Sequence, residues 1–257
     1  MKIRIDSIEL NYEIVMPNGA RHYDDADVVI IFLHEALGSI PQWKQFPQQL
    51  CSGLNLPGII YDRQGHGHSD PFIKQRDANY LHTYALEELP LLVAKISNPN
   101  QKVLLLGHSD GGSIALLYAH QYPENIEGVI TMAAHVINEP ETIAGIEPAV
   151  KAYEKGKLDG LKKFHSEKTN DLFYAWADIW RDSSFLDWNI THEIGGHFPG
   201  LFIQGAEDQY GTERQLELIK EKHPNGTTCL TPNCGHHPHL QQSETILELI
   251  ADWYSKG

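Results

Sequence analysis

The sequence has few cysteines, few basic residues relative to acidic ones, and no long apolar run. Its 257 residues include three cysteines, Cys51, Cys229 and Cys234, whose spacing matches no metal-binding motif. We expect free thiols in a reducing cytoplasm, with a Cys229–Cys234 disulfide as the alternative. No apolar stretch reaches the ~18 residues of a membrane span, and the N-terminus lacks the apolar core of a secretory signal. These absences predict a cytoplasmic protein that does not bind membranes.

The charge balance argues against a nucleic-acid-binding protein. There are 20 Lys and Arg against 34 Asp and Glu, for a formal net charge of -14. Binding to phosphate backbones requires clustered basic residues, which this composition lacks. The simplest interpretation is an acidic, solvated surface. The expected partner is therefore a small-molecule substrate, and the expected state of the protein is a monomer or a homodimer without cofactor or metal.

Short apolar runs alternate with helical patterns along most of the chain. Residues 28–33 form a continuous apolar run, which suits a strand buried on both faces of a parallel sheet. Alternating strands and helices predict an α/β fold with helices on both faces. The predicted strands are 3–6, 8–15, 28–33, 58–62, 103–106, 128–133, 200–205 and 227–230, and the predicted helices are 42–50, 80–96, 113–121, 212–221 and 243–254.

The alternation stops between residues 137 and 197. This stretch has helical patterns and no convincing strand. It also holds an aromatic cluster that includes Trp176, Trp180 and Trp188. We predict a core domain made of residues 1–136 and 198–257, with residues 137–197 as a helical cap.

A nucleophile motif follows the strand predicted at 103–106. Residues 107–111 read Gly-His-Ser-Asp-Gly, and a helical pattern comes directly after them. Strand, G-x-S-x-G turn and helix are the context in which a serine is raised above the edge of a sheet on a sharp turn. Ser109 is therefore the candidate nucleophile.

A serine nucleophile needs a base, an acid that orients the base, and donors for the oxyanion. His236 is the candidate base because it follows the last predicted strand, with His237 as runner-up and His239 as a packing or capping residue. Asp208 is the candidate acid, and Glu139 is the second option. A metal site at the three histidines is the alternative for this segment. The expected oxyanion donors are the backbone N–H groups of Ala36 and Asp110.

Several segments together resemble the α/β-hydrolase superfamily over nearly the whole chain. The chain order Ser109, Asp208, His236 matches that fold. The matching motifs are residues 34–38 (H-G-x-x-G), 62–70 (D-x-R-G-x-G-x-S) and 235–239 (G-H-x-P-H). The resemblance implies a mostly parallel eight-stranded sheet with helices on both faces and a cap inserted after the sixth strand. It also implies a Ser-His-Asp triad.

Two residues depart from this pattern, and the first of them lies in the candidate oxyanion loop. Glu35 stands where the family usually has glycine, and Gln64 separates Arg63 from Gly65. A buried Glu35 carboxylate would need a partner. Arg63 is one candidate for that partner. The alternative is a solvated or locally hydrogen-bonded Glu35.

The Ser-Asp-Gly-Gly elbow resembles the valacyclovir-hydrolase-like branch, in which the aspartate is implicated in recognising a substrate amino group. This resemblance makes Asp110 a candidate for substrate binding, whereas a hydrogen-bonded role near the helix N-terminus is the alternative. The cap aromatics either line the pocket or pack the cap against the core. The candidate pocket residues are His34, Glu35, Asp110, His135, Trp176, Trp180 and Tyr210.

The resemblance implies a serine hydrolase that cleaves a small ester, thioester or activated amide through an acyl-enzyme. A C–C bond hydrolase or a pyruvate-eliminating lyase would use the same three residues, but their acidic substrates require basic pocket residues. Besides Arg63, the elbow and oxyanion loop offer none. A slow-turnover ligand receptor on the same scaffold is the alternative from another class. Fold alone does not give a substrate.

Overall fold

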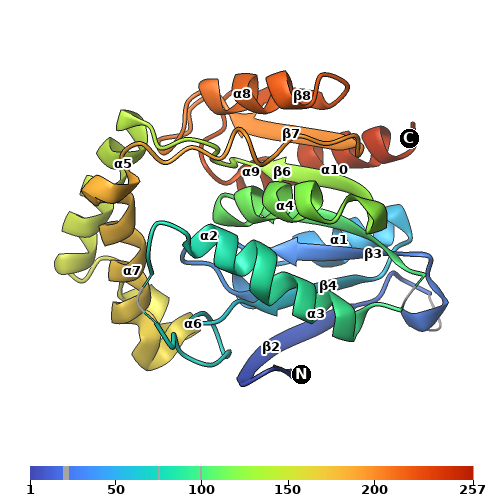
Figure 1. Ribbon diagram of the computed structural model, residues 1–257, viewed down its shortest axis with the longest axis horizontal. Coiled ribbons are helices and arrows are strands. Elements are labelled where there is room, and N and C mark those ends of the chain that lie inside the picture. Colours follow the sequence, from blue (N-terminus) through green and yellow to red (C-terminus); the bar gives the residue numbers. More distant parts are fainter. Residues whose placement is uncertain (20–22, 75, 99, 257) are drawn as a thin grey trace.

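An eight-stranded sheet forms the centre of the computed structural model, which describes residues 1–19, 23–74, 76–98 and 100–256 (Figure 1). The strand order is β1-β2-β4-β3-β5-β6-β7-β8. The pairs β1–β2 and β2–β4 are antiparallel, and the other neighbouring pairs are parallel. This confirms the predicted mostly parallel sheet. The strands are β1 (Lys2–Ile5), β2 (Ile8–Val15), β3 (Val28–Leu33), β4 (Gly58–Asp62), β5 (Lys102–His108), β6 (Ile126–Met132), β7 (Gly200–Gly205) and β8 (Thr227–Thr231).

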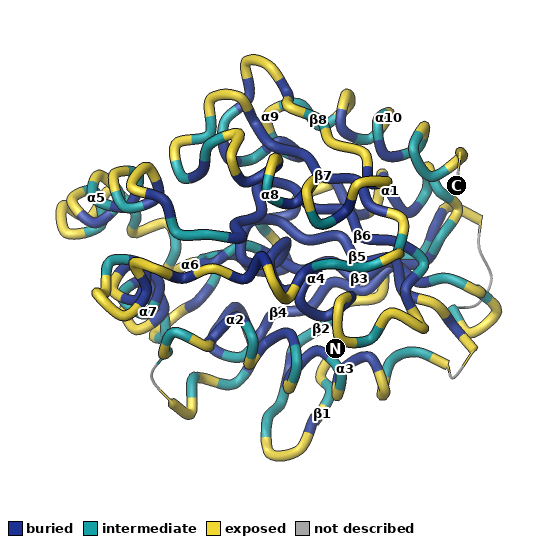
Figure 2. The backbone as a smooth tube through the Cα atoms, turned by 45° about the horizontal axis from the view of Figure 1, so that its top comes forward, coloured by how far each residue is buried: buried dark blue, intermediate teal, exposed yellow. Residues whose placement is uncertain are grey.

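Alternating side chains of the strands divide the core into two layers. Val29 and Ile31 of β3 pack with α3 (Leu89–Ile96), α4 (Asp110–Gln121) and α8 (Arg214–Lys222). Ile30 and Phe32 point to the opposite face, where α1 (Phe46–Leu54) and α10 (Ser243–Tyr254) cover them. Helices therefore cover both faces, as predicted, and the inner strands β3 to β7 between them are almost entirely buried (Figure 2).

Two predicted helices differ from those observed. Residues 42–50 contain the end of a short 3-10 turn, η2 (Ile40–Trp43), and the start of α1. The left-handed backbone of Lys44 (φ 54°) separates them. Residues 80–96 form α2 (Tyr80–Thr83), a π-helical turn η3 (Tyr84–Glu88) and α3. Pro90 lacks an N–H, so it cannot bond to the turn before it, and the helix widens there.

Helices without an intervening strand make up residues 137–197, the segment predicted as a cap. They are α5 (Pro140–Glu154), α6 (Lys162–His165) and α7 (Thr169–Arg181), with short turns η5 (Asp159–Leu161), η6 (Ser166–Lys168) and η7 (Ser183–Phe185). The three helices gather on one side of the sheet (Figure 1). An isolated bridge between Ile137 and Asn189 ties the two ends of the segment together. The remaining short elements are η1 (Tyr23–Asp25), η4 (Pro123–Asn125) and α9 (Pro238–Gln241).

Two expectations drawn from absences concern the cysteines and membranes. Cys51, Cys229 and Cys234 are free thiols, so the alternative of a Cys229–Cys234 disulfide is wrong. Of the helices in the described part of the chain, none combines the length and apolar character needed to cross a membrane.

The turn between β5 and α4 depends on glycine. A Cβ on Gly111 would lie 1.9 Å from Leu33 O of the neighbouring strand, and one on Gly107 would lie 2.1 Å from Gly111 O. Both contacts are to backbone, so neither is relieved by a side-chain rotation. These glycines allow the start of α4 to pack directly on β3 and β5.

We predict that Gly111→Ala lowers the free energy of unfolding by about 3 kcal/mol or more, because the added methyl group overlaps a backbone carbonyl. Gly53→Ala is the matched control. Gly53 lies within α1 with open space around its Cα, so alanine there should stabilise the helix by about 0.5–1 kcal/mol. Chemical denaturation of both variants measures the two changes. Equal stability of Gly111→Ala and the wild type would contradict the packing described here.

Candidate functional site

Three parallel strands end beside one cavity, and each is followed by a residue expected at the site. Ser109 follows β5, Asp208 follows β7 and His236 follows β8. Ser109 has φ 54° and ψ -119°, a strained conformation for a non-glycine residue and the one expected of a nucleophile elbow. Ser109 and His236 both line this cavity, whose volume is about 250 Å³.

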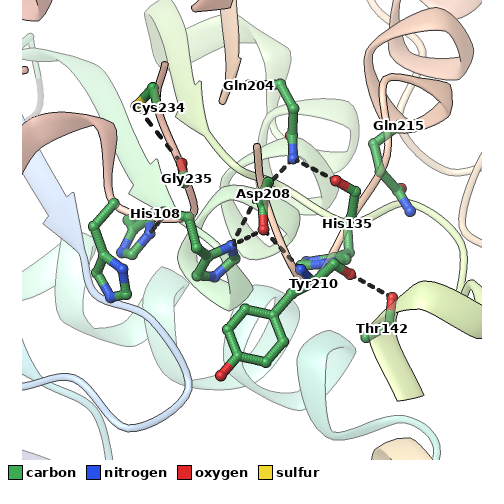
Figure 3. Close-up of polar contacts among 12 residues, drawn as sticks. His108, His135, Thr142, Gln204, Asp208, Tyr210, Gln215, Cys234 and Gly235 are labelled. Atoms are coloured by element: carbon green, nitrogen blue, oxygen red, sulfur yellow. Dashed lines mark hydrogen bonds and ion pairs between the residues drawn. The ribbon is translucent and has the colours of Figure 1, made fainter. Parts of the chain in front are cut away.

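Asp208 fixes the ring of His236. His236 Nδ1 lies 2.8 Å and 2.9 Å from the two carboxylate oxygens of Asp208. The same carboxylate accepts hydrogen bonds from Gln204 Nε2 at 2.7 Å and from the Tyr210 N–H at 2.8 Å (Figure 3). Burial opposes ionisation of Asp208, but His236, His135 and the Tyr210 N–H together outweigh it and hold the pKa of the carboxyl below its ordinary value.

This contact determines the tautomer of His236. A carboxylate only accepts, so Nδ1 carries the proton and Nε2 is left as an acceptor. Within the described residues no hydrogen bond uses Nε2. In its neutral form the imidazole therefore offers an unprotonated nitrogen at the cavity that Ser109 also lines.

The alternative residues for base and acid do not contact the Asp208–His236 pair in this way. Glu139 accepts hydrogen bonds from Thr212 and Gln215 and makes none to His236. His237 lines the cavity, but burial lowers its pKa to about 4. His239 is buried against Trp43 at the start of α9, a packing position. In the described chain no group of three or more His, Cys, Asp or Glu residues is placed to hold a metal ion.

The candidate oxyanion donors are two backbone N–H groups. Asp110 is the first residue of α4, where the N–H has no partner within the helix. Ala36 is buried in the loop after β3, and in the described structure no hydrogen bond uses its N–H. Both residues line the cavity with Ser109. The positive end of the α4 dipole lies at this point and favours negative charge.

The proposed ion pair between Arg63 and Glu35 is wrong. The Arg63 guanidinium instead donates to two backbone carbonyls, those of His34 and Glu35. The Glu35 carboxylate accepts the Leu37 N–H at 2.7 Å, which is the local hydrogen bond named as the alternative. Burial raises the pKa of Glu35 above its ordinary value, although Leu37 and His236 oppose the shift.

Asp110 places a second carboxylate beside the cavity. Its side chain is 1 % exposed, and its Oδ2 accepts a hydrogen bond from Tyr80 at 3.0 Å. The Trp180 indole donates to the Tyr80 hydroxyl at 2.9 Å, which links the cap to this carboxylate. No other hydrogen bond to Asp110 side-chain oxygens is found in the described structure, so Oδ1 has no partner there.

Six of the seven expected pocket residues line the cavity. They are Glu35, Asp110, His135, Trp176, Trp180 and Tyr210. His34 does not, because both of its ring nitrogens bond to backbone and it lines an adjoining cavity of about 280 Å³. Trp188 stacks on Phe185 within the cap. Trp176 and Trp180 therefore serve both expected roles, since they pack the cap and form a wall of the cavity.

Sequence reasoning missed several residues at the site. Gln204 orients Asp208, and its position at the end of a strand four residues before the acid was the available signal. Tyr80 lies in a helix whose pattern does not mark it as a contact of Asp110. The cavity is also lined by Gln42 of η2 and by five residues of the cap, Thr142, Ile146, Ala149, Leu158 and Leu161.

The family assignment comes from comparison with known proteins. The family model described as serine aminopeptidase, S33, matches residues 26–158, just over half of the chain. The chain belongs to this family. It is a serine-hydrolase-type member of the α/β-hydrolase superfamily, as the motifs indicated.

Relatives match over nearly the whole chain. The human serine hydrolase BPHL is 25% identical, over 98% of this chain and 85% of its own length. A proline iminopeptidase of Saccharolobus solfataricus is 29% identical, over 97% of this chain and 90% of its own length. The solved structure of MGS-M2, an alpha/beta hydrolase from a Medee basin deep-sea metagenome library, has a TM-score of 0.77 at 20% identity, covering 99% of this chain and 97% of that one. The last likeness supports the fold.

Proposed function

We propose that this protein is a serine hydrolase that cleaves a small ester, thioester or activated amide through an acyl-enzyme. Ser109 is the nucleophile, His236 the base and Asp208 the residue that orients it. The observation that carries the proposal is the hydrogen bond from His236 Nδ1 to Asp208, which leaves Nε2 ready to accept a proton at the cavity that Ser109 also lines. The strained backbone of Ser109 supports the same assignment.

The reaction proceeds in two steps, acylation of Ser109 and hydrolysis of the acyl-enzyme. Ser109 Oγ bonds to the substrate carbonyl carbon while its proton passes to His236 Nε2. The N–H groups of Ala36 and Asp110 hold the oxyanion, a contribution of up to about 3 kcal/mol per donor. The leaving group departs with the proton from His236. Water then attacks the acyl carbon, gives a proton to His236, and the bond to Ser109 breaks as Ser109 regains its proton.

The charge of the cavity supports a substrate with a cationic amino group. Glu35 and Asp110 both line it, and no Lys or Arg is found among the described lining residues. Asp110 Oδ1 is available to an ammonium, and charge-assisted hydrogen bonds of this kind are the strong ones. The similarity to a proline iminopeptidase agrees with this preference. The cavity volume of about 250 Å³ limits the acyl part of the substrate to a small group.

The same charges disfavour the alternatives with acidic substrates. C–C bond hydrolysis of a vinylogous diketone acid, or elimination of pyruvate, would place substrate carboxylates beside Glu35 and Asp110. Repulsion between the substrate carboxylate and these two carboxylates would weaken binding. A slow-turnover receptor on this scaffold would differ from the proposed enzyme in its turnover number alone.

We predict that Ser109→Ala lowers the turnover number on p-nitrophenyl esters by more than about 10³-fold, because the nucleophile is removed. The melting temperature should not fall, since the exchange removes one hydroxyl at the cavity surface. Ser255→Ala, at an exposed position after α10, is the matched control and should keep the wild-type rate. A Ser109→Ala rate close to that of the wild type would exclude Ser109 as nucleophile.

We predict that Asp110→Asn lowers kcat/KM for valine p-nitrophenyl ester by about 10-fold or more, because one charge-assisted hydrogen bond is lost. For the 3-methylbutanoate ester, which lacks only the amino group, the change should be under threefold. Glu207→Gln, an exposed neighbour of Asp208, is the control and should change neither value. Equal losses on the two esters would show that Asp110 does not recognise the amino group.

A further inference from the structure

Side chains donate to three of the four backbone carbonyls of the loop from His34 to Leu37. Arg63 donates to the carbonyls of His34 and Glu35. His165 Nε2 lies 2.9 Å from Leu37 O. Arg63 follows β4 in the core, whereas His165 ends α6 of the cap. The loop that carries Ala36 is therefore bound by side chains from both the core and the cap.

The hydrogen bond from Arg63 to Glu35 O determines the direction of the Ala36 N–H. The two groups belong to one planar trans peptide, so they face opposite directions. Arg63 Nη2 fixes the carbonyl at 3.0 Å on the core side, which leaves the N–H facing the cavity. The next peptide is held through the Leu37 N–H, which donates to the Glu35 carboxylate.

His165 supplies the cap's own link to this loop. Its ring is fully buried and joins two core loops, because Nδ1 accepts the Gly67 N–H at 2.9 Å and Nε2 donates to Leu37 O. The Gly67 N–H only donates and Leu37 O only accepts, so the neutral tautomer with the proton on Nε2 satisfies both. Burial lowers the pKa of His165 below its ordinary value and favours this neutral form.

We propose that His165 is a positioning residue for the oxyanion donor Ala36, so that docking of the cap and formation of the oxyanion hole are coupled. This inference rests on the proposed function, because it assigns a structural cause to one of that site's donors. The cap residue Lys168 makes a useful contrast. Its ammonium donates to His66 O and Ser69 O, so it ties the cap to the core without contacting residues 34–38.

The experiment compares His165→Phe, His165→Gln and Lys168→Met with the wild type. Phenylalanine keeps a ring and loses both hydrogen bonds, whereas the glutamine amide retains a donor and an acceptor. For each variant we would measure kcat and KM on a p-nitrophenyl ester and the melting temperature. We would also measure inhibition by a trifluoromethyl ketone, whose adduct with Ser109 places an oxyanion in the hole, and by the product carboxylic acid, which forms no such adduct.

We expect His165→Phe to lower kcat about 10-fold, a fraction of the 10²–10³-fold reported for loss of a whole oxyanion donor, with KM changed less than twofold. Inhibition by the ketone should weaken by a similar factor, and inhibition by the acid should not. His165→Gln should recover most of kcat, and Lys168→Met should leave kcat and ketone inhibition unchanged.

Three results would overturn the inference. They are equal kcat losses in His165→Phe and Lys168→Met, equal weakening of both inhibitors, and full activity of His165→Phe alongside Ser109-dependent turnover by the wild type. If the wild type shows no Ser109-dependent turnover, the proposed function fails and this inference fails with it. Should His165→Phe not fold, His165→Ala is judged by the same comparisons.

Discussion

The sharp turn from β5 into α4 is the constraint on which the rest of the site depends. Ser109 adopts a left-handed backbone (φ 54°), which costs a non-glycine residue on the order of 1–3 kcal/mol. The surrounding packing sustains that strain. Gly107 and Gly111 let the helix start against the strands, and the Ser109 N–H bonds to Met132 O at 2.9 Å. The outcome is a hydroxyl at the N-terminus of a helix, beside the ends of the strands that carry Asp208 and His236.

The electrostatics of the cavity explain why a cationic substrate would suit this site. An oxyanion that forms beside the carboxylates of Asp110 and Glu35 would be opposed by like charge. A bound ammonium would offset that repulsion and so favour the transition state of an amino-bearing substrate over a neutral one. The raised pKa of Glu35 lessens the repulsion of the oxyanion for any substrate, because a protonated carboxyl adds no negative charge, and it also weakens the attraction of the site for an ammonium.

The strands and the residues that follow them were predictable because local patterns encode them. Continuous apolar runs marked β3 and β5, and Ser109, Asp208 and His236 each come within a few residues of a strand end. Contacts between distant segments were not predictable in this way. Gln204 could be noticed because it precedes Asp208 by four residues. The hydrogen bonds of Tyr80 to Asp110 and of His165 to Leu37 O depend instead on how the helices and the cap pack against the core. Arg63 illustrates the same limit, since carbonyl groups that no sequence pattern displays compete for its guanidinium.

The most direct test of the serine mechanism is to trap the covalent intermediate. Wild-type protein would be quenched with acid during turnover of a p-nitrophenyl ester, and its intact mass and peptide masses measured. We expect a fraction of the chains to carry a single acyl group, on the peptide that contains Ser109. The rates of acylation and deacylation set that fraction. Sustained Ser109-dependent turnover with the acyl group on a different residue would contradict the assignment of Ser109 as the nucleophile.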